Sequence, residues 1–374
     1  MLHSMIQSKH PIAALLLLLA LLLPAGAAAA QTVAPPLDRA IDDYAGTHEF
    51  SGTILVARHG HVLYRKSHGL AERAFSVPAT DDTRYRIASI TKLFTSVIIL
   101  QLAQTGRLDL QAPIRTYLPD YPGEGGDRIT LHQLLNHTSG LAQYDRITSL
   151  DQALVEGVEP YQRPQTAAQL LQRCCSGPLA RAPGTAFDYN NGDYILLGRI
   201  IERVTGIPYA EVLRIRLLSP LGLESSGMAD QARIVPRLAP TYYWREDQRN
   251  LMNDLPFYFQ NWDAAGGMYS TVDDLLAFAE ALYGGQLLLP GSLELLLTPG
   301  LDDYGYGLWS YDFERGGRRH RVAKRPGSIM GSNGVLYRLL DEQATVVILA
   351  NTNRTDLDAF AQRIGEWVLD SQGE

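Results

Sequence analysis

The chain has 374 residues, of which 46% are hydrophobic, so it can bury one large core or roughly two domain-sized ones. Charged residues make up 20% and the formal net charge is −7, with no basic block along the sequence. These values argue against nucleic-acid binding through phosphate neutralisation, and the moderate acidity suggests solubility rather than a specific partner.

The first thirty residues differ in kind from the rest. Lys9 precedes an apolar run over 12–23, and Pro24 and the small residues 27–30 follow it. This order is typical of a cleaved export signal, and the run of about a dozen residues is short for a membrane span, which needs about 20. We therefore expect a signal peptide over 1–30 and a periplasmic or secreted protein with no other membrane contact. An uncleaved N-terminal anchor is the alternative.

The next segment combines a helix, a hairpin and a second helix. Residues 37–44 place apolar side chains on one face, as an amphipathic helix does. Two β-rich runs over 51–69 flank the turn His59-Gly60, which indicates a hairpin. A helix is then predicted from about Ser89 to Gln104, because Gly106 ends the apolar pattern.

Helical and β-rich segments follow in separate blocks. Helices are predicted over 131–136, 166–174, 193–205 and 210–217, and strands over 305–313, 319–325, 334–340 and 344–350. Residues 357–369 form a final amphipathic helix.

These elements predict an α/β (α+β) protein with an antiparallel sheet flanked by helices. The N-terminal hairpin and the late strands would share the sheet, with the first and last helices on one face and the Ser89 helix on the other. The predicted domains are the signal peptide over 1–30, a sheet domain built from 31–111 and 263–374, and a mostly helical inserted region over 112–262.

The two cysteines of the chain, Cys174 and Cys175, are adjacent. Disulfides usually join residues whose Cα atoms are about 5–6 Å apart, which neighbours do not satisfy without strain. We therefore expect two unpaired thiols in or near a helix, with an intermolecular bridge as the alternative. Neither a disulfide framework nor a zinc site is expected.

Ser89 and Lys92 lie three residues apart in the apolar stretch IASITKLF at 87–94. Residues with this spacing share a helix face about 5–6 Å apart at Cβ, so the amine can reach the hydroxyl. Burial lowers the pKa of a lysine, and a neutral Lys92 could take the proton of a nucleophilic Ser89. The alternative is an N-capping serine and a lysine that extends to the surface.

Tyr189 and Asn191 lie in the stretch FDYNNGDY, in a predicted loop before a helix. A phenol that faces Lys92 could relay a proton to a leaving group, and an amide could orient a substrate carbonyl. Because Asn-Asn-Gly is common in turns of any fold, a plain turn is the alternative.

Six stretches together resemble one family in their order along the chain. They are YRIASITKLFTS at 85–96, LHQLLNHTSGL at 131–141, YNN at 189–191, AAGGMYSTVDDL at 264–275, YGYGLW at 304–309 and RPGSIMGSNG at 325–334. With them, residues 37–370 resemble the serine β-lactamase and penicillin-binding protein superfamily. The resemblance is to its class C-like branch, which includes DD-carboxypeptidases, D-aminopeptidases and esterases.

The resemblance implies a β-lactamase/transpeptidase-like fold and a serine hydrolase that works through an acyl-Ser89 intermediate. Lys92 would be the base, Tyr189 the second acid/base, and Asn191 would position substrate. The backbone N–H groups of Ser89 and Ser328 would form the oxyanion hole. The implied partner is a small-molecule or peptide substrate, such as a D-amino-acid peptide or an acyl ester, with no metal or organic cofactor. The oligomeric state stays open.

The third motif departs from the family pattern of Lys or His, then a small residue or Thr, then Gly. Here it reads Arg325, Pro326, Gly327. An arginine cannot shuttle protons but can bind a substrate carboxylate bidentately, and its alternative is a surface residue in a basic strand. Pro326 fits only an edge strand, and Gly327 permits close backbone approach. The departure leaves open a non-hydrolytic penicillin-binding-like sensor or interaction protein that keeps the fold.

Overall fold

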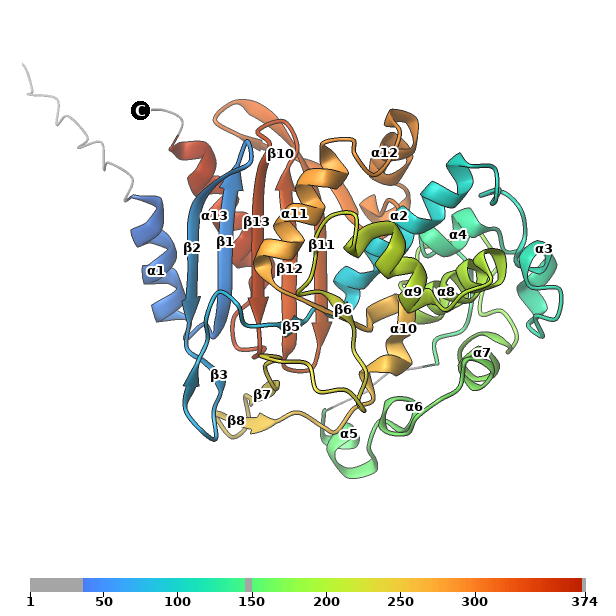
Figure 1. Ribbon diagram of the computed structural model, residues 1–374, viewed down its shortest axis with the longest axis horizontal. Coiled ribbons are helices and arrows are strands. Elements are labelled where there is room, and N and C mark those ends of the chain that lie inside the picture. Colours follow the sequence, from blue (N-terminus) through green and yellow to red (C-terminus); the bar gives the residue numbers. More distant parts are fainter. Residues whose placement is uncertain (1–35, 145–149, 372–374) are drawn as a thin grey trace, which may run out of the picture. The chain divides into compact units, whose positions relative to one another are not determined.

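One six-stranded antiparallel sheet takes strands from both parts of the chain, in the order β10-β11-β12-β13-β1-β2 (Figure 1). The computed structural model describes residues 36–144 and 150–371, so the signal peptide expected over 1–30 lies outside the described residues. The strands are β1 (Gly52–Arg58), β2 (His61–His68), β10 (Trp309–Arg315), β11 (Arg318–Ile329), β12 (Ser332–Leu339) and β13 (Ala344–Ala350). β1 pairs with β13 from Gly52↔Ala350 to Arg58↔Ala344, which joins the N-terminal hairpin to the late strands.

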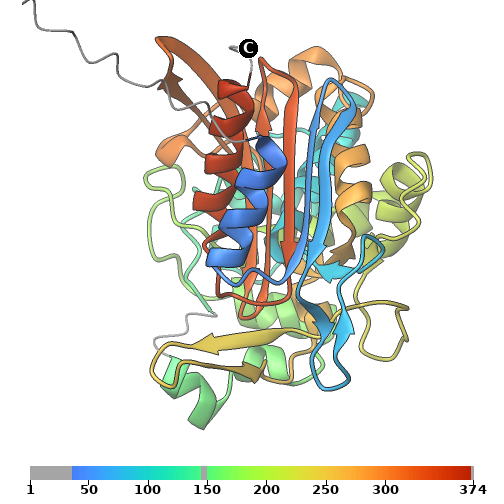
Figure 2. The same cartoon turned by 90° about the vertical axis from the view of Figure 1, so that its left-hand side faces the viewer.

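Helices cover both faces of this sheet. α1 (Leu37–Thr47) and α13 (Leu357–Asp370) lie side by side on one face, as Figure 2 shows, and α13 contacts β12 and β13. α11 (Val272–Tyr283) contacts β1 and β13 on the other face. All seven positions of β13 are buried, which explains its unbroken apolar sequence ATVVILA. The predicted antiparallel sheet between helical layers is therefore confirmed.

The helix α11 is missing from the predicted elements, although the sequence carries its start signal. The side chain of Thr271 caps α11 by accepting a hydrogen bond from the backbone N–H of Asp274 at 3.3 Å. Leu275, Phe278 and Leu282 then recur at helical spacing and are buried. The prediction assigned this sheet face to the Ser89 helix alone, whereas α11 covers part of it.

The chain between the two parts of the sheet is mostly helical, with short strands. Its helices are α3 (Ile114–Tyr117), α4 (Leu131–Leu135), α5 (Leu150–Glu156), α6 (Glu159–Gln162), α7 (Ala167–Cys175), α8 (Asn191–Thr205), α9 (Tyr209–Leu213), α10 (Asp263–Gly266) and, beyond α11, α12 (Pro290–Leu297). The 3₁₀ turns are η1 (Ala88–Ile90), η2 (Glu124–Asp127), η4 (Phe259–Trp262) and η5 (Leu301–Asp303), and η3 (Arg214–Leu218) is a π-helical turn. Small sheets join β3 (Leu70–Glu72) to β4 (Val77–Pro78), β5 (Tyr85–Arg86) and β6 (Gly227–Met228) to β9 (Met268–Ser270), and β7 (Tyr242–Arg245) to β8 (Asn250–Asn253). The domain boundaries at 111 and 262 stay a prediction.

The central helix α2 (Thr91–Gln104) is buried on almost every side. Its apolar residues include Phe94, which stacks on Phe278 of α11 with ring centroids 3.7 Å apart. A helix that is apolar all round belongs inside a core, and α2 contacts α8 and α10 there. The predicted helix start differs, because Ser89 lies in the 3₁₀ turn η1 and the α-helix begins at Thr91.

Strand β11 changes from an inner strand to an edge strand along its length. β10 pairs with it only from Arg318 to Lys324, whereas β12 pairs with it as far as Ile329. Pro326 therefore lies beyond the end of β10, where a missing backbone N–H breaks no ladder on that side. This arrangement also leaves the last residues of β11 free on one side, next to η1.

We expect Phe360→Ala to lower the free energy of unfolding by about 3–5 kcal/mol, because it opens a cavity between α13 and α1. The ring of Phe360 is fully buried, and its centroid lies 4.2 Å from that of Tyr44. Phe75→Ala is the matched control: Phe75 is 84% exposed, so the change should stay within about 0.5 kcal/mol. Urea denaturation measures both, and equal effects would contradict this view of the core.

Candidate active site

The hydroxyl of Ser89 lies between two groups that can carry a proton. The amine of Lys92 donates to its Oγ at 3.1 Å, and the phenol of Tyr189 donates to the same atom at 2.8 Å. Ser89 belongs to η1, Lys92 to the first turn of α2, and Tyr189 to the loop before α8. The structure thus brings together three side chains that the sequence predicted to act as one unit.

The side chain of Lys92 is fully buried, which rules out the alternative of a surface lysine. Besides Ser89, its Nζ donates to the side-chain oxygen of Asn191 at 2.7 Å and to the backbone oxygen of Ala265 at 2.8 Å. Three acceptors match the three donors that an ammonium offers. The amine is therefore fixed in direction toward Ser89, while its proposed neutral state stays a prediction.

Tyr189 is held in an electropositive environment. Its hydroxyl accepts a hydrogen bond from Nη2 of Arg325 at 2.7 Å, and Nζ of Lys92 lies 4.8 Å from the centroid of its ring. Burial raises the pKa of Tyr189, but the charges of Arg325 and Lys92, with the hydrogen bonds of Lys92 and Ser89, outweigh it and bring the pKa down to about 8. The phenol can therefore both release and regain a proton near neutral pH.

Arg325 is buried inside the site, so the alternative of a surface arginine is wrong. Besides its bond to Tyr189, Nη1 donates to the hydroxyl of Tyr304 at 2.7 Å and to the backbone oxygen of Gly307 at 3.3 Å. Nε donates to the backbone oxygen of Pro326 at 3.0 Å. Four of the five N–H groups of the guanidinium are therefore engaged within the protein. This leaves little of it free for the predicted substrate carboxylate.

Gly327 brings the backbone of β11 against the turn that holds Ser89. A Cβ atom added at Gly327 would collide with the backbone oxygen of Ile87 and lie 3.1 Å from the backbone nitrogen of Ser89. Ser328 follows it and is exposed, opposite Asn333 of β12. Strand and turn therefore lie side by side where the oxyanion hole is predicted, and the assignment of the two N–H donors stays a prediction.

Two polar partners in the site were missed by sequence reasoning. Tyr304 accepts from Arg325, and the backbone oxygen of Ala265 accepts from Lys92. Both lie in stretches that supported the family resemblance, at 304–309 and 264–275. A contribution from a backbone oxygen leaves no side-chain signature, so only the contact itself identifies Ala265.

The expectation of free thiols is wrong, because Cys174 and Cys175 form a disulfide at the end of α7. Both residues are buried, and Sγ of Cys175 lies 3.6 Å from the backbone oxygen of Gly192 in α8. The spacing rule that argued against the bond describes cysteines from separate segments, whereas these two share one helix end.

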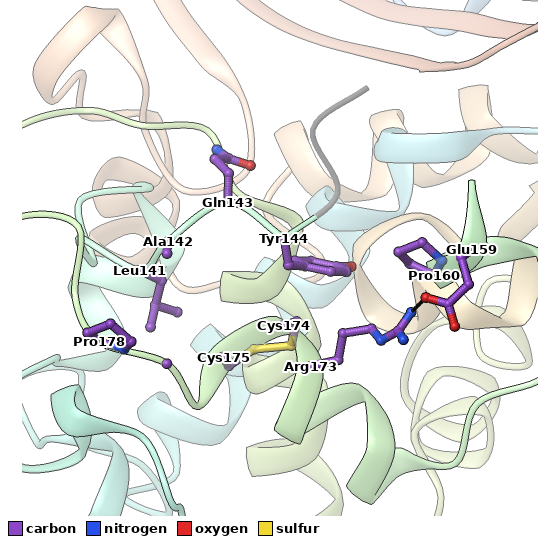
Figure 3. A pocket seen from close by; sticks show the side chains of 11 residues that line it. Leu141, Ala142, Gln143, Tyr144, Glu159, Pro160, Arg173, Cys174, Cys175 and Pro178 are labelled. Atoms are coloured by element: carbon purple, nitrogen blue, oxygen red, sulfur yellow. Dashed lines mark hydrogen bonds and ion pairs between the residues drawn. A yellow bond between two sulfur atoms is a disulfide. The ribbon is translucent and has the colours of Figure 1, made fainter. Parts of the chain in front are cut away.

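A pocket of about 380 Å³ opens beside this disulfide (Figure 3). Its wall includes Gln143, whose amide donates to the carboxylate of Asp188 at 3.1 Å and to the backbone oxygen of Tyr189. Ser89 does not line it. The pocket therefore neighbours the Tyr189 loop without containing the reactive hydroxyl.

In the described ranges 36–144 and 150–371, no cluster of three or more His, Cys, Asp or Glu side chains could hold a metal ion. No helix within the same ranges is long and apolar enough to cross a membrane.

The sheet lies between helical layers, and Ser89 and Lys92 lie at the start of a buried helix beside the end of β11. This arrangement defines a β-lactamase/transpeptidase-like protein. A penicillin binding protein from Bacillus halodurans superposes with a TM-score of 0.74 at 28% identity, covering 87% of this chain and 98% of that one. A D-stereospecific amidohydrolase from Streptomyces sp. gives a TM-score of 0.70 at 28% identity, covering 84% of this chain and 93% of that one.

Within this class, the chain belongs to the beta-lactamase family, whose model matches residues 37–368. Esterase EstB of Burkholderia gladioli is 30% identical over 298 residues, which are 71% of this chain and 74% of that protein. The superfamily predicted from the six stretches is thereby confirmed.

The ionisation of Tyr189 can be followed directly by ultraviolet difference absorbance. We expect the spectrum of the wild type minus Tyr189→Phe to show one tyrosinate that forms as the pH rises through about 8, below the usual value for tyrosine. Arg325→Met should raise this midpoint by at least about one pH unit, because it removes the nearest positive charge and leaves the burial. An unchanged midpoint would contradict the role of Arg325.

Proposed function

We propose that this protein is a serine hydrolase that cleaves esters or amides through an acyl intermediate on Ser89. The observation that carries the proposal is the position of Ser89 Oγ, within hydrogen-bond distance of both Lys92 and Tyr189. Membership of the beta-lactamase family supports it, as does similarity to an esterase and a D-stereospecific amidohydrolase.

In the proposed acylation step, a neutral Lys92 takes the proton of Ser89 while Oγ attacks the substrate carbonyl carbon. The backbone N–H groups of Ser89 and Ser328 stabilise the oxyanion that forms. Tyr189 then gives its proton to the leaving alcohol or amine, and the C–O or C–N bond breaks. The chain is left with an ester on Ser89, an ammonium on Lys92 and a phenolate on Tyr189.

Deacylation uses the same groups in reverse. The Tyr189 phenolate takes a proton from water and the hydroxide attacks the acyl carbon. Ser89 then leaves and regains its proton from the ammonium of Lys92. A pKa of about 8 suits a group that must be acid in one step and base in the next at neutral pH. Arg325 stabilises the phenolate between these steps, since a guanidinium holds its own proton.

The contacts of Arg325 favour substrates without a carboxylate at this position. Tyr189, Tyr304 and two backbone oxygens already occupy most of its donors. We therefore infer that neutral acyl esters and amides are the preferred class, with Asn191 positioning the substrate. We also propose export to the periplasm or beyond the cell, which the signal-like composition of residues 1–30 supports.

We expect Ser89→Ala to lower steady-state hydrolysis of a p-nitrophenyl acyl ester at least about a thousandfold, since the nucleophile is lost. A fluorophosphonate probe should label the wild type, and peptide mapping should place the label on Ser89. An unlabelled Ser89, under conditions that label a control hydrolase, would overturn the proposal. Labelling and a single burst without turnover on esters, amides and β-lactams would instead support the sensor alternative.

We expect Arg325→Ala to lower kcat by about a hundredfold for neutral and carboxylate-bearing esters alike, because Arg325 acts through Tyr189. Arg325→Lys should recover part of the loss, because an ammonium restores the charge without the fork geometry. Steady-state kinetics on matched ester pairs measure this. A loss confined to carboxylate-bearing substrates would support the carboxylate clamp instead.

A further inference from the structure

Two buried titratable residues next to the site have no part in the proposed reaction. His137 follows α4, and Asp193 lies in the first turn of α8; both side chains are fully buried. Nδ1 of His137 lies 2.7 Å from Oδ2 of Asp193, and the hydroxyl of Ser139 donates to Oδ1 of Asp193 at 2.5 Å. Groups of this kind are costly to bury unless they are paired, so their position needs a reason.

The contacts around Nδ1 of His137 bear on where the protons lie. The backbone N–H of Asn190, which can only donate, points to Nδ1 of His137 at 3.3 Å. When Nδ1 accepts from Asn190, the proton of the 2.7 Å contact belongs to the carboxyl of Asp193. His137 is then the neutral tautomer with its proton on Nε2, and Asp193 is a carboxylic acid that accepts from Ser139 and donates to His137.

The surrounding charges favour the same neutral pair. Burial, together with the positive charges of Lys92 and Arg325, holds the pKa of His137 well below its usual range. Burial holds the pKa of Asp193 well above its usual range, against the opposing effects of Ser139 and Lys92. A charged imidazolium at this position would add a positive charge beside the two basic side chains around Tyr189.

His137 is tied to the loop on both sides of Tyr189. Its backbone oxygen accepts from the N–H of Asp188 at 2.9 Å, and its Nδ1 accepts from the N–H of Asn190. The centroid of its ring lies 4.4 Å from that of Tyr189. Its other ring nitrogen, Nε2, makes no hydrogen bond among the described residues and lies in an aromatic enclosure.

We propose that His137 is a positioning residue for Tyr189, and that the protonated carboxyl of Asp193 holds it there as a neutral imidazole. The inference rests on the proposed function, because it concerns the proton carrier of the same site. A rotation of the His137 ring would release the backbone N–H of Asn190 and the ring face of Tyr189 together. The phenol would then lose its fixed distance to Ser89 and Arg325.

The test compares Asp193→Asn with Asp193→Ala and His137→Phe in the full chain, using a neutral p-nitrophenyl ester. The amide of Asn can donate to His137 and accept from Ser139, as the carboxylic acid does, so Asp193→Asn should keep kcat within about threefold. Asp193→Ala and His137→Phe should lower kcat by about a hundredfold, with KM within about threefold, because the proton carrier is misplaced. In both, the tyrosinate midpoint of Tyr189 should rise above about 8.

Ser139→Ala is the matched control, since it removes a hydrogen bond to the same carboxyl without touching the loop that carries Tyr189. It should lower the Tm but keep kcat within about threefold and leave the tyrosinate midpoint unchanged. If His137→Phe behaves like Ser139→Ala, the role of His137 is only structural and the proposal fails.

A loss of kcat in Asp193→Asn equal to that in Asp193→Ala would show that the pair needs a charge, which also overturns the proposal. Asp193→Asn keeps the test decisive even if Asp193→Ala and His137→Phe do not fold, because asparagine is isosteric with the native aspartate. Failure of the proposed function is a separate outcome, since the wild type itself would then show no label on Ser89 and no turnover.

Discussion

The arrangement depends on two basic side chains buried around one phenol. Lys92 and Arg325 both lie inside the protein, and both act on Tyr189. A charge removed from water is destabilising unless oxygen atoms surround it. The protein supplies these oxygens from several separate segments, among them Ala265 before β9 and Tyr304 before β10. The two basic side chains therefore take partners from segments that lie far apart in the sequence.

The sheet determines how Arg325 and Gly327 reach the site. β10 ends its pairing at Lys324, so the next residues of β11 have a free side where a strand would otherwise lie. Arg325 turns inward toward Tyr189 there, and Gly327 lets the strand touch the Ser89 turn. Both effects follow from the different lengths of two neighbouring strands. Without that difference, Pro326 would break a ladder and Arg325 would have a strand beside it.

Short sequence patterns were sufficient to predict the contacts between residues that are close in the sequence. Ser89 and Lys92 are close because they are three residues apart at a helix start, and this relation survives the shift of the α-helix start to Thr91. The contact from Tyr189 spans 100 positions in sequence and could be inferred only through the family pattern.

Other features depended on contacts that no short pattern encodes. The burial of Arg325 follows from where β10 begins, because Trp309 pairs with Lys324, whereas the predicted strand began at residue 305. The disulfide of Cys174 and Cys175 was not predicted, because the usual Cα spacing of disulfides describes cysteines from separate segments. For His137, only its contacts with Tyr189 and with the backbone beside it indicate a role.

The ring nitrogen Nε2 of His137 has a thermodynamic consequence for the whole molecule. A buried donor without an acceptor costs about 1–3 kcal/mol, and no partner for it exists among the described residues. A phenylalanine would fill the same aromatic enclosure without that cost, but it could not accept from Asn190. It would also leave the buried carboxyl of Asp193 without its 2.7 Å partner, so the histidine serves two buried polar groups and leaves one ring nitrogen unpaired. One ring nitrogen of His137 thus stays without a partner while the other contacts the loop before α8.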